Sequence, residues 1–208
     1  MARTSKSFER KKPKFKVQPR TLILCEDSKS CLIYLQEAAR HYRSFASIQI
    51  AHCGKTDPLG IIGEARKQIR VFESVFCAID RDSHHGFDDA LRLAERNGVK
   101  VIASFPSYEF WLLLHFRKTR APYMAAGALS AGDRIVRDLL LENGMDIYSK
   151  GATRGLFLYL LSRLPEARKR SIEVLAEARA DGEMNPSTLM HDLLDHFEEL
   201  GNPQPITT

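Results

Sequence analysis

The stretch that decides the fold is "SVFCAIDRDSHHGFDDALRLAERNGVKVIASF", residues 74–105. Residues 74–79 and 100–105 are short apolar runs of the length typical of buried strands. Between them, residues 86–97 have helical spacing and are followed by Gly98, a common helix stop. A strand, a helix and a strand in direct succession predict a right-handed βαβ unit whose two strands are parallel in one sheet.

The same alternation occurs on the N-terminal side of this unit. Residues 21–25 ("TLILC") and 48–53 ("IQIAHC") predict strands. Residues 28–42 and 59–72 place their apolar side chains at helical spacing. The sequence therefore predicts an α/β fold, with a parallel sheet of four or slightly more strands that has helices on both faces.

The rest of the chain reads as helical. Residues 108–116 ("YEFWLLLHF") are too apolar for a surface helix and predict a mostly buried one. After about residue 130 we find only helical patterns and no further strand. In "NPST", residues 185–188, we expect a helix start, with Asn185 as the N-cap and Pro186 as the first helical residue.

Composition divides the chain into a basic tail, an α/β core, a helical part packed on that core and a polar tail, at residues 1–20, 21–118, 119–200 and 201–208. The formal net charge is +5, but residues 1–20 hold eight Lys/Arg and one Glu, a net +7, which leaves −2 for the other residues. We expect both tails to be disordered. The basic tail either attracts phosphates or an acidic partner, or serves only as a solubilising leader.

Neither a bilayer-spanning apolar run nor a signal peptide is evident, so we expect a cytoplasmic protein without membrane contact. The four cysteines show no Cys-x-x-Cys pairing and are expected to be reduced core thiols; they are Cys25, Cys31, Cys53 and Cys77.

Carboxylates follow three of the predicted strands. Glu26 follows the first, Asp80 and Asp82 end the third, and Glu109 comes shortly after the fourth. The carboxyl ends of parallel strands meet at one edge of a sheet, where ligands bind. Crowded carboxylates repel one another unless they are protonated or neutralised, and hard oxygen ligands suit Mg²⁺ or Mn²⁺. The sequence therefore predicts a divalent-metal site at this edge.

Each of these polar features also has a structural interpretation. Asp27 or Ser28 is a suitable N-cap for the helix that follows, and Asp-Arg-Asp is also typical of a solvated turn. His84 and His85 are more typical of a polar turn than of a metal ligand or base, and His115 of a buried structural histidine.

The order of motifs resembles the RloB-like family, and the resemblance covers nearly everything after the basic tail. The motifs are "LILCEDSKS", "AIDRD", "SFPSYEFWLLLHF", "YSKG" and "NPSTLMHDLL". The resemblance implies a Toprim-type, Rossmann-like core. It also implies that Glu26, Asp80 and Asp82 coordinate Mg²⁺ during cleavage of nucleic-acid phosphodiesters, and that Glu109, the acid of the family's third motif, serves the same site.

The resemblance further implies a nuclease for DNA or RNA in prokaryotic antiviral defence of the abortive-infection type, acting with an ATPase partner. The sequence has no Walker A pattern, so any nucleotide hydrolysis must come from that partner. Lys150, in "YSKG", either stabilises negative charge on the phosphate or is only a surface lysine before Gly151. Lys29 and Arg81 are either contacts to the phosphate backbone or solvated loop residues.

Two other functions stay open. A receiver domain would use Asp80 as phospho-acceptor and Ser104 at the end of the fourth strand, but it needs a fifth strand ending in Lys-Pro, which we do not find. A non-catalytic module would bind a metal and a partner without turnover. A nucleotide-cofactor enzyme is disfavoured because no Gly-x-Gly-x-x-Gly follows a strand. The helices after residue 130 offer surface for a homo-oligomer or for the ATPase.

Overall fold

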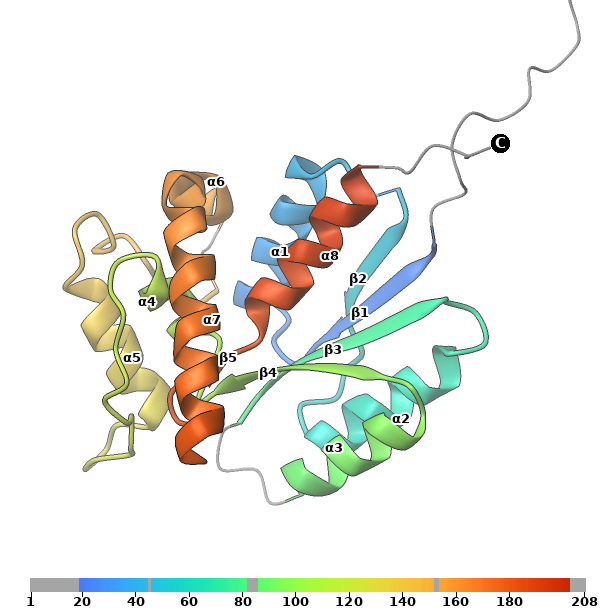
Figure 1. The fold of residues 1–208 in the computed structure, drawn as a ribbon, viewed down its shortest axis with the longest axis horizontal. Coiled ribbons are helices and arrows are strands. Elements are labelled where there is room, and N and C mark those ends of the chain that lie inside the picture. Colours follow the sequence, from blue (N-terminus) through green and yellow to red (C-terminus); the bar gives the residue numbers. More distant parts are fainter. Residues whose placement is uncertain (1–18, 45, 82–85, 152–153, 203–208) are drawn as a thin grey trace, which may run out of the picture.

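A computed structural model describes residues 19–44, 46–81, 86–151 and 154–202. Its centre is a five-stranded sheet of order β2-β1-β3-β4-β5 (Figure 1). The strands are β1 (Thr21–Cys25), β2 (Ile48–His52), β3 (Ser74–Asp80), β4 (Lys100–Phe105) and β5 (Ser187–Thr188). The first four strands are parallel and β5 is antiparallel to β4. The predicted α/β class is confirmed.

Helices cover both faces of the sheet, as expected for a parallel sheet that buries its strands on two sides. They are α1 (Ser30–His41), α2 (Pro58–Gln68), α3 (Phe87–Arg96), α4 (Glu109–Leu114), α5 (Ala131–Leu140), α6 (Leu156–Leu160), α7 (Leu164–Asp181) and α8 (Met190–Gly201), with a short 3₁₀ turn at Leu161–Arg163. In Figure 1, α2 and α3 lie on one face, α1 and α8 lie on the other, and α4 to α7 gather beyond the carboxyl ends of the strands. No helix in the described part of the chain is both long and apolar enough to cross a membrane.

Side chains along the central strands point alternately to the two faces of the sheet, and each face has its own hydrophobic core. Leu22 and Leu24 of β1 belong to the cluster that α2 and α3 complete, whereas Ile23 and Cys25 belong to the cluster shared with α1 and α8. The register places Cys25 opposite Ala78. The carboxyl ends of β1, β3 and β4 are therefore neighbours along one edge.

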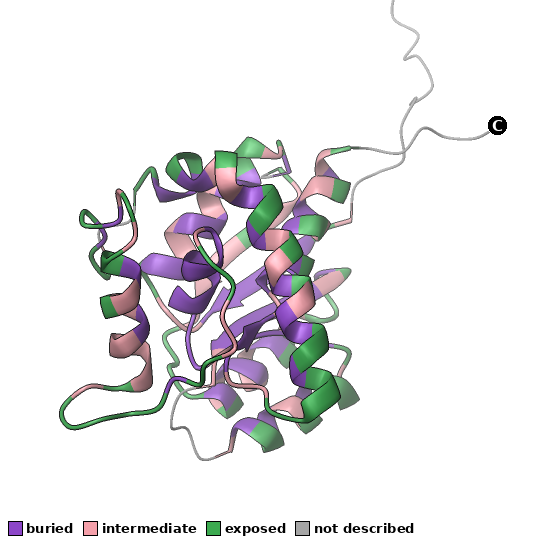
Figure 2. Cartoon of the chain, turned by 60° about the vertical axis from the view of Figure 1, so that its left-hand side comes forward, coloured by how far each residue is buried: buried purple, intermediate pink, exposed green. Residues whose placement is uncertain are grey.

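The predicted buried helix is confirmed, because all six residues of α4 are buried (Figure 2). Its Trp111 donates an indole hydrogen bond to the Tyr34 hydroxyl of α1, with 2.9 Å between nitrogen and oxygen. The side chains of α8 that pack inward, among them Leu194 and Phe197, belong to the same core cluster as Tyr34 and Trp111. The C-terminal helical part thus packs on the α/β core, as expected.

The segment at residues 185–188 corrects two predictions. The Asn185–Pro186 bond is cis, Ser187–Thr188 pairs with β4, and α8 begins only at Met190. Asn185 does not cap a helix; its side-chain amide donates to the Tyr123 carbonyl at 2.8 Å and accepts from the Tyr123 amide at 3.2 Å. The expectation that no further strand follows residue 130 was wrong, because two polar residues leave no apolar pattern to detect.

The four cysteines are free thiols, as expected. Cys25, Cys31 and Cys77 are buried, and Cys53 is partly exposed.

Candidate functional site

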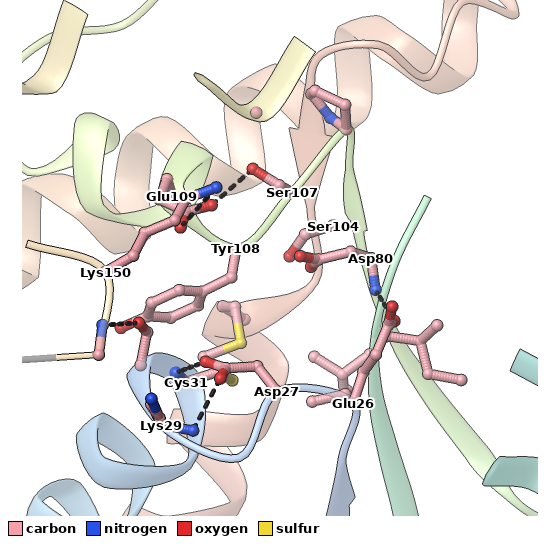
Figure 3. Close-up of a pocket in the computed structure, with 18 of the residues that line it drawn as sticks. Glu26, Asp27, Lys29, Cys31, Asp80, Ser104, Ser107, Tyr108, Glu109 and Lys150 are labelled. Carbon is pink, nitrogen blue, oxygen red and sulfur yellow. Dashed lines mark hydrogen bonds and ion pairs between the residues drawn. The ribbon is translucent and has the colours of Figure 1, made fainter. Parts of the chain in front are cut away.

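A cavity of about 380 Å³ lies at the carboxyl edge of the sheet (Figure 3). Its walls come from the ends of β1, β3 and β4, the start of α4, the start of α5 at Ser130 and Gly132, and the loop at residues 150–151. Four of the predicted site residues line it, namely Glu26, Asp80, Glu109 and Lys150. Residues far apart in the sequence therefore meet here. The fifth, Asp82, lies outside the described residues, together with His84 and His85.

Glu26 and Asp80 are linked across the two central strands. The Asp80 backbone amide donates to Glu26 Oε2 at 2.9 Å, and the Glu26 amide donates to the Ala78 carbonyl at 3.0 Å. These bonds fix the first residue after β1 beside the end of β3. Burial raises the pKa of Asp80 well above its ordinary value, and the nearby carboxylates of Glu109 and Glu26 raise it further.

The carboxylates of Glu26, Asp80 and Glu109 have the donor chemistry of a divalent-metal site. Their oxygens are hard ligands, and a bound cation would relieve the charge repulsion that raises the pKa of Asp80. Within the described ranges, no three His, Cys, Asp or Glu residues form a group that could hold a metal ion. The full predicted ligand set also includes Asp82, which those ranges do not contain.

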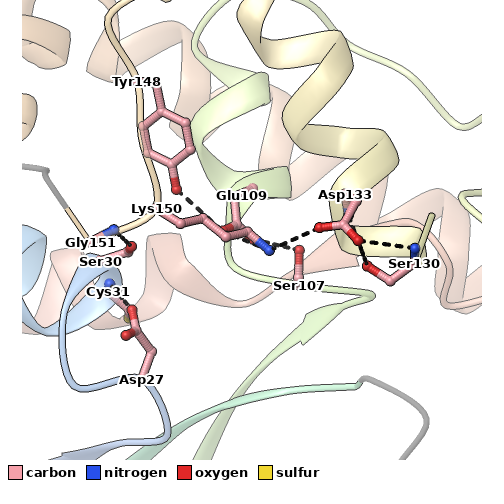
Figure 4. A network of polar contacts seen from close by, with 10 residues as sticks. All are labelled: Asp27, Ser30, Cys31, Ser107, Glu109, Ser130, Asp133, Tyr148, Lys150 and Gly151. Carbon is pink, nitrogen blue, oxygen red and sulfur yellow. Dashed lines mark hydrogen bonds and ion pairs between the residues drawn. The ribbon is translucent and has the colours of Figure 1, made fainter. Parts of the chain in front are cut away.

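Glu109 is buried and paired. Its carboxylate accepts hydrogen bonds from the Ser107 hydroxyl at 2.7 Å and from the Tyr148 hydroxyl at 3.2 Å (Figure 4). Lys150 Nζ lies 3.7 Å from Glu109 Oε1. A carboxylate in this apolar segment would be costly to bury alone, and these three partners offset that cost.

Lys150 lies between two acids. Its Nζ is 3.7 Å from Asp133 Oδ1 as well as from Glu109, and half of its side chain is exposed. Asp133 belongs to the capping box at the start of α5, where its carboxylate accepts from the Ser130 hydroxyl at 2.7 Å. Both lysine distances exceed those of a good N–H···O bond, so the ammonium is oriented toward the cavity while keeping donors for a ligand.

Sequence reasoning missed the residues that surround Lys150. Ser107, Ser130, Asp133 and Tyr148 are single polar residues without a characteristic spacing. The Ser130–Asp133 capping pattern was readable as a helix start, but nothing in the sequence places that helix start beside Lys150.

The N-cap residue of α1 is Lys29 and not Asp27 or Ser28, but Asp27 still stabilises the first turn of this helix. Its carboxylate accepts from the backbone amides of Lys29 at 2.7 Å and Cys31 at 2.8 Å, which caps the first turn of α1. The neighbouring Ser30 hydroxyl accepts from the Gly151 amide at 3.0 Å, so α1 also holds the loop that carries Lys150. Lys29 lines the same cavity.

The structure also bears on the role of His115 and on the receiver-domain alternative. His115 is buried, its Nδ1 lies 3.0 Å from the Trp111 carbonyl, and burial lowers its pKa to about 4, as suits a structural histidine. The Ser104 hydroxyl is hydrogen bonded to Thr188 at 2.9 Å. Across the described segments no parallel strand follows β4, which leaves the receiver alternative without its fifth strand.

Comparison with known protein families identifies a match. The family model described as "RloB-like protein" matches residues 21–197, most of the chain. The matched range contains the whole sheet and every residue of the candidate site. Neither a curated protein nor a solved structure matches the chain.

Proposed function

We propose that this chain, which belongs to the RloB-like family, is a Toprim-type, metal-dependent nuclease that hydrolyses phosphodiester bonds of DNA or RNA. The observation that carries the proposal is the cavity at the sheet edge, where Glu26, Asp80 and Glu109 face the same space as Lys150. Acids that suit a metal and a lysine that suits a phosphate oxygen are the two requirements of metal-assisted phosphoryl transfer.

Glu26 and Asp80 are the proposed ligands for Mg²⁺ or Mn²⁺, with Asp82 as the third. When bound, the metal lowers the pKa of a water molecule and offsets charge on the phosphate. Glu26 serves either as a ligand or as the acceptor of a proton from the attacking water; its contact with the Asp80 amide holds it at the cavity wall in either role.

Lys150 is the proposed electrostatic partner of the phosphate. Its ammonium is held near Glu109 and Asp133 without a short hydrogen bond to either, so it can donate to the negative charge that develops on the phosphate oxygens. Glu109, with its oxygens engaged by Ser107 and Tyr148, positions Lys150; its implied service as a metal ligand stays a prediction.

We further propose a role in antiviral defence together with an ATPase partner, as the resemblance to the family implies, and a location in the cytoplasm. The sequence contains no Walker A motif, so we propose that the partner supplies any ATP hydrolysis that triggers cleavage.

The test is cleavage of end-labelled DNA and RNA with Mg²⁺ or Mn²⁺, with and without the candidate ATPase. We expect Asp80→Asn and Lys150→Met each to lower the cleavage rate at least a hundredfold. The first removes the negative charge of a proposed metal ligand, and the second removes the positive charge proposed to stabilise the phosphate. Asp88→Asn, an exposed carboxylate on α3, is the matched control and should cleave at the wild-type rate. If no substrate is cleaved while calorimetry detects Mn²⁺ binding that Asp80→Asn abolishes, the protein is a binding module and the nuclease proposal fails.

A further inference from the structure

A second cavity, of about 480 Å³, opens beside the first at the same edge of the sheet. It is lined by Arg81, Phe105, Pro106, Met124, Gly182, Glu183, Met184 and Asn185. Pro106 also lines the carboxylate cavity, so one residue separates the two. Of the expected catalytic residues that the structure describes, none lines this second cavity.

Strand geometry explains why the cavities lie back to back. Consecutive side chains at a strand end point to opposite faces of the sheet. Asp80 and Ser104 accordingly line the carboxylate cavity, while the next residues, Arg81 and Phe105, line the second one. A strand of nucleic acid that crosses the edge at Pro106 would therefore present one nucleotide to each cavity.

The walls of the second cavity suit a flat, aromatic ligand. Met124 is 61% exposed and Met184 is partly exposed, so both side chains are accessible to a ligand in this cavity. Phe105 packs edge-on against Phe87, with 5.6 Å between ring centroids, and the Arg81 guanidinium lies 5.0 Å from the Phe87 centroid. Methionine sulfur and guanidinium groups both pack well against π faces.

The exposed methionine is held in place. The Met124 carbonyl accepts from Arg134 at 2.9 Å, and its sulfur accepts from the Asn185 amide at 3.7 Å. Asn185 in turn pairs with the Tyr123 backbone, so the Met124 loop is fixed against β5. The apolar wall is therefore preorganised, which lowers the entropy cost of binding.

We propose that this second cavity is a subsite for an unpaired nucleobase adjacent to the phosphate held in the carboxylate cavity. The inference rests on the proposed nuclease function, because continuity with the phosphate site is what selects a nucleotide as the occupant. The volume lies in the range of small-ligand pockets. A base can enter only when it is out of its pair, so the preferred substrate is a single strand, or a duplex with an unpaired nucleotide.

The test is binding of fluorescein-labelled 12-nucleotide single-stranded DNA and RNA, and of the same sequences as duplexes, measured by anisotropy in Ca²⁺ so that binding is separated from turnover. Met124→Ala should weaken single-strand binding at least fivefold, because packing of a base against a side chain contributes measurably to affinity. Val71→Ala, a 52% exposed apolar residue just before β3 and so at the opposite edge of the sheet, is the matched control and should bind as wild type.

A second readout locates the base. With 2-aminopurine placed at successive positions, wild-type protein should change the fluorescence at one position, and Met124→Ala should abolish that change. Equal affinity for single strand and duplex, or an unchanged signal in Met124→Ala, overturns the subsite even if cleavage is observed. The opposite combination, a base-specific signal with no cleavage under Mg²⁺ or Mn²⁺, supports the subsite and rejects the nuclease. Absence of any oligonucleotide binding overturns both.

Discussion

Three titratable residues, of which Glu109 and His115 are buried and Asp80 is half-buried, show how differently one protein accommodates charge. Glu109 is paired with a lysine and two hydroxyls. Asp80 instead faces two other carboxylates, which raise its pKa together with burial. His115 stays neutral, because burial opposes its protonation. A bound cation would relieve the repulsion at Asp80, which is why we propose the metal site there rather than at the histidine.

His115 predicts how stability depends on pH. Its folded pKa is about 4, whereas an unfolded histidine titrates near 6.5, so between these values the unfolded chain binds a proton that the folded chain does not. Stability from this residue is therefore present above pH 6.5 and is lost as the pH falls, by about 2 kcal/mol from pH 7 to pH 5. Urea unfolding at both pH values should show that loss in wild type and a smaller one in His115→Gln.

The exposed His41 supplies the control for this experiment. His41→Gln removes an imidazole from the surface of α1, and measuring it beside His115→Gln separates a general effect of replacing a histidine from the effect of burial. Identical pH dependence in wild type and His115→Gln would mean that the buried ring accepts a proton in the folded state.

At the scale of elements, the sequence predicts what hydrophobic spacing controls. The strands β1 to β4 and the buried helix α4 follow from apolar runs, and the structure has them. The short β5 does not follow, because tertiary pairing with β4 and the Asn185 contacts to Tyr123 override a local pattern that favours a helix start. Asparagine does favour the N-cap position of a helix, but in the fold the Asn185 side chain forms hydrogen bonds with the backbone of Tyr123, which lies in a loop distant in the sequence.

Asp27 stabilises the start of α1, and the neighbouring Glu26 is the proposed catalytic acid. Asp27→Ala should lower the unfolding free energy by about 1 kcal/mol, because two backbone amides lose their acceptor. Asp27→Asn keeps an acceptor oxygen and should cleave within a fewfold of the wild-type rate, whereas Glu26→Gln should lose cleavage. Cleavage rates measured with Mn²⁺ for Asp27→Asn and Glu26→Gln distinguish the two roles. Equal losses of rate in both variants would make Asp27 part of the metal site.

At the scale of the whole molecule, topology explains how far the site was predictable. Parallel strands bring their carboxyl ends to one edge, so acids after β1, β3 and β4 were expected to meet, and Glu26, Asp80 and Glu109 do line one cavity. The C-terminal half contributes Asp133, Tyr148 and the loop of Lys150. How helices pack around an edge depends on side-chain fit over the whole core, which no local pattern encodes.

If the protein binds nucleic acid as proposed, the charge distribution of the whole chain predicts which segment supplies the non-specific affinity. The cavity is rich in acids and residues 21–208 carry a net −2, so long-range attraction must come largely from the basic N-terminal stretch. Residues 1–18 contain seven Lys/Arg, and each phosphate contact they make releases counterions.

Deleting residues 1–18 should weaken binding of single-stranded DNA about tenfold at low salt and reduce the slope of log K against log salt by about two, measured by anisotropy from 50 to 200 mM salt. Deleting residues 203–208, which carry no charged side chain, is the control and should change neither quantity. An unchanged slope after the first deletion would assign the basic stretch to solubility and place the phosphate contacts on Lys29, Lys150 and the other cations of the folded part.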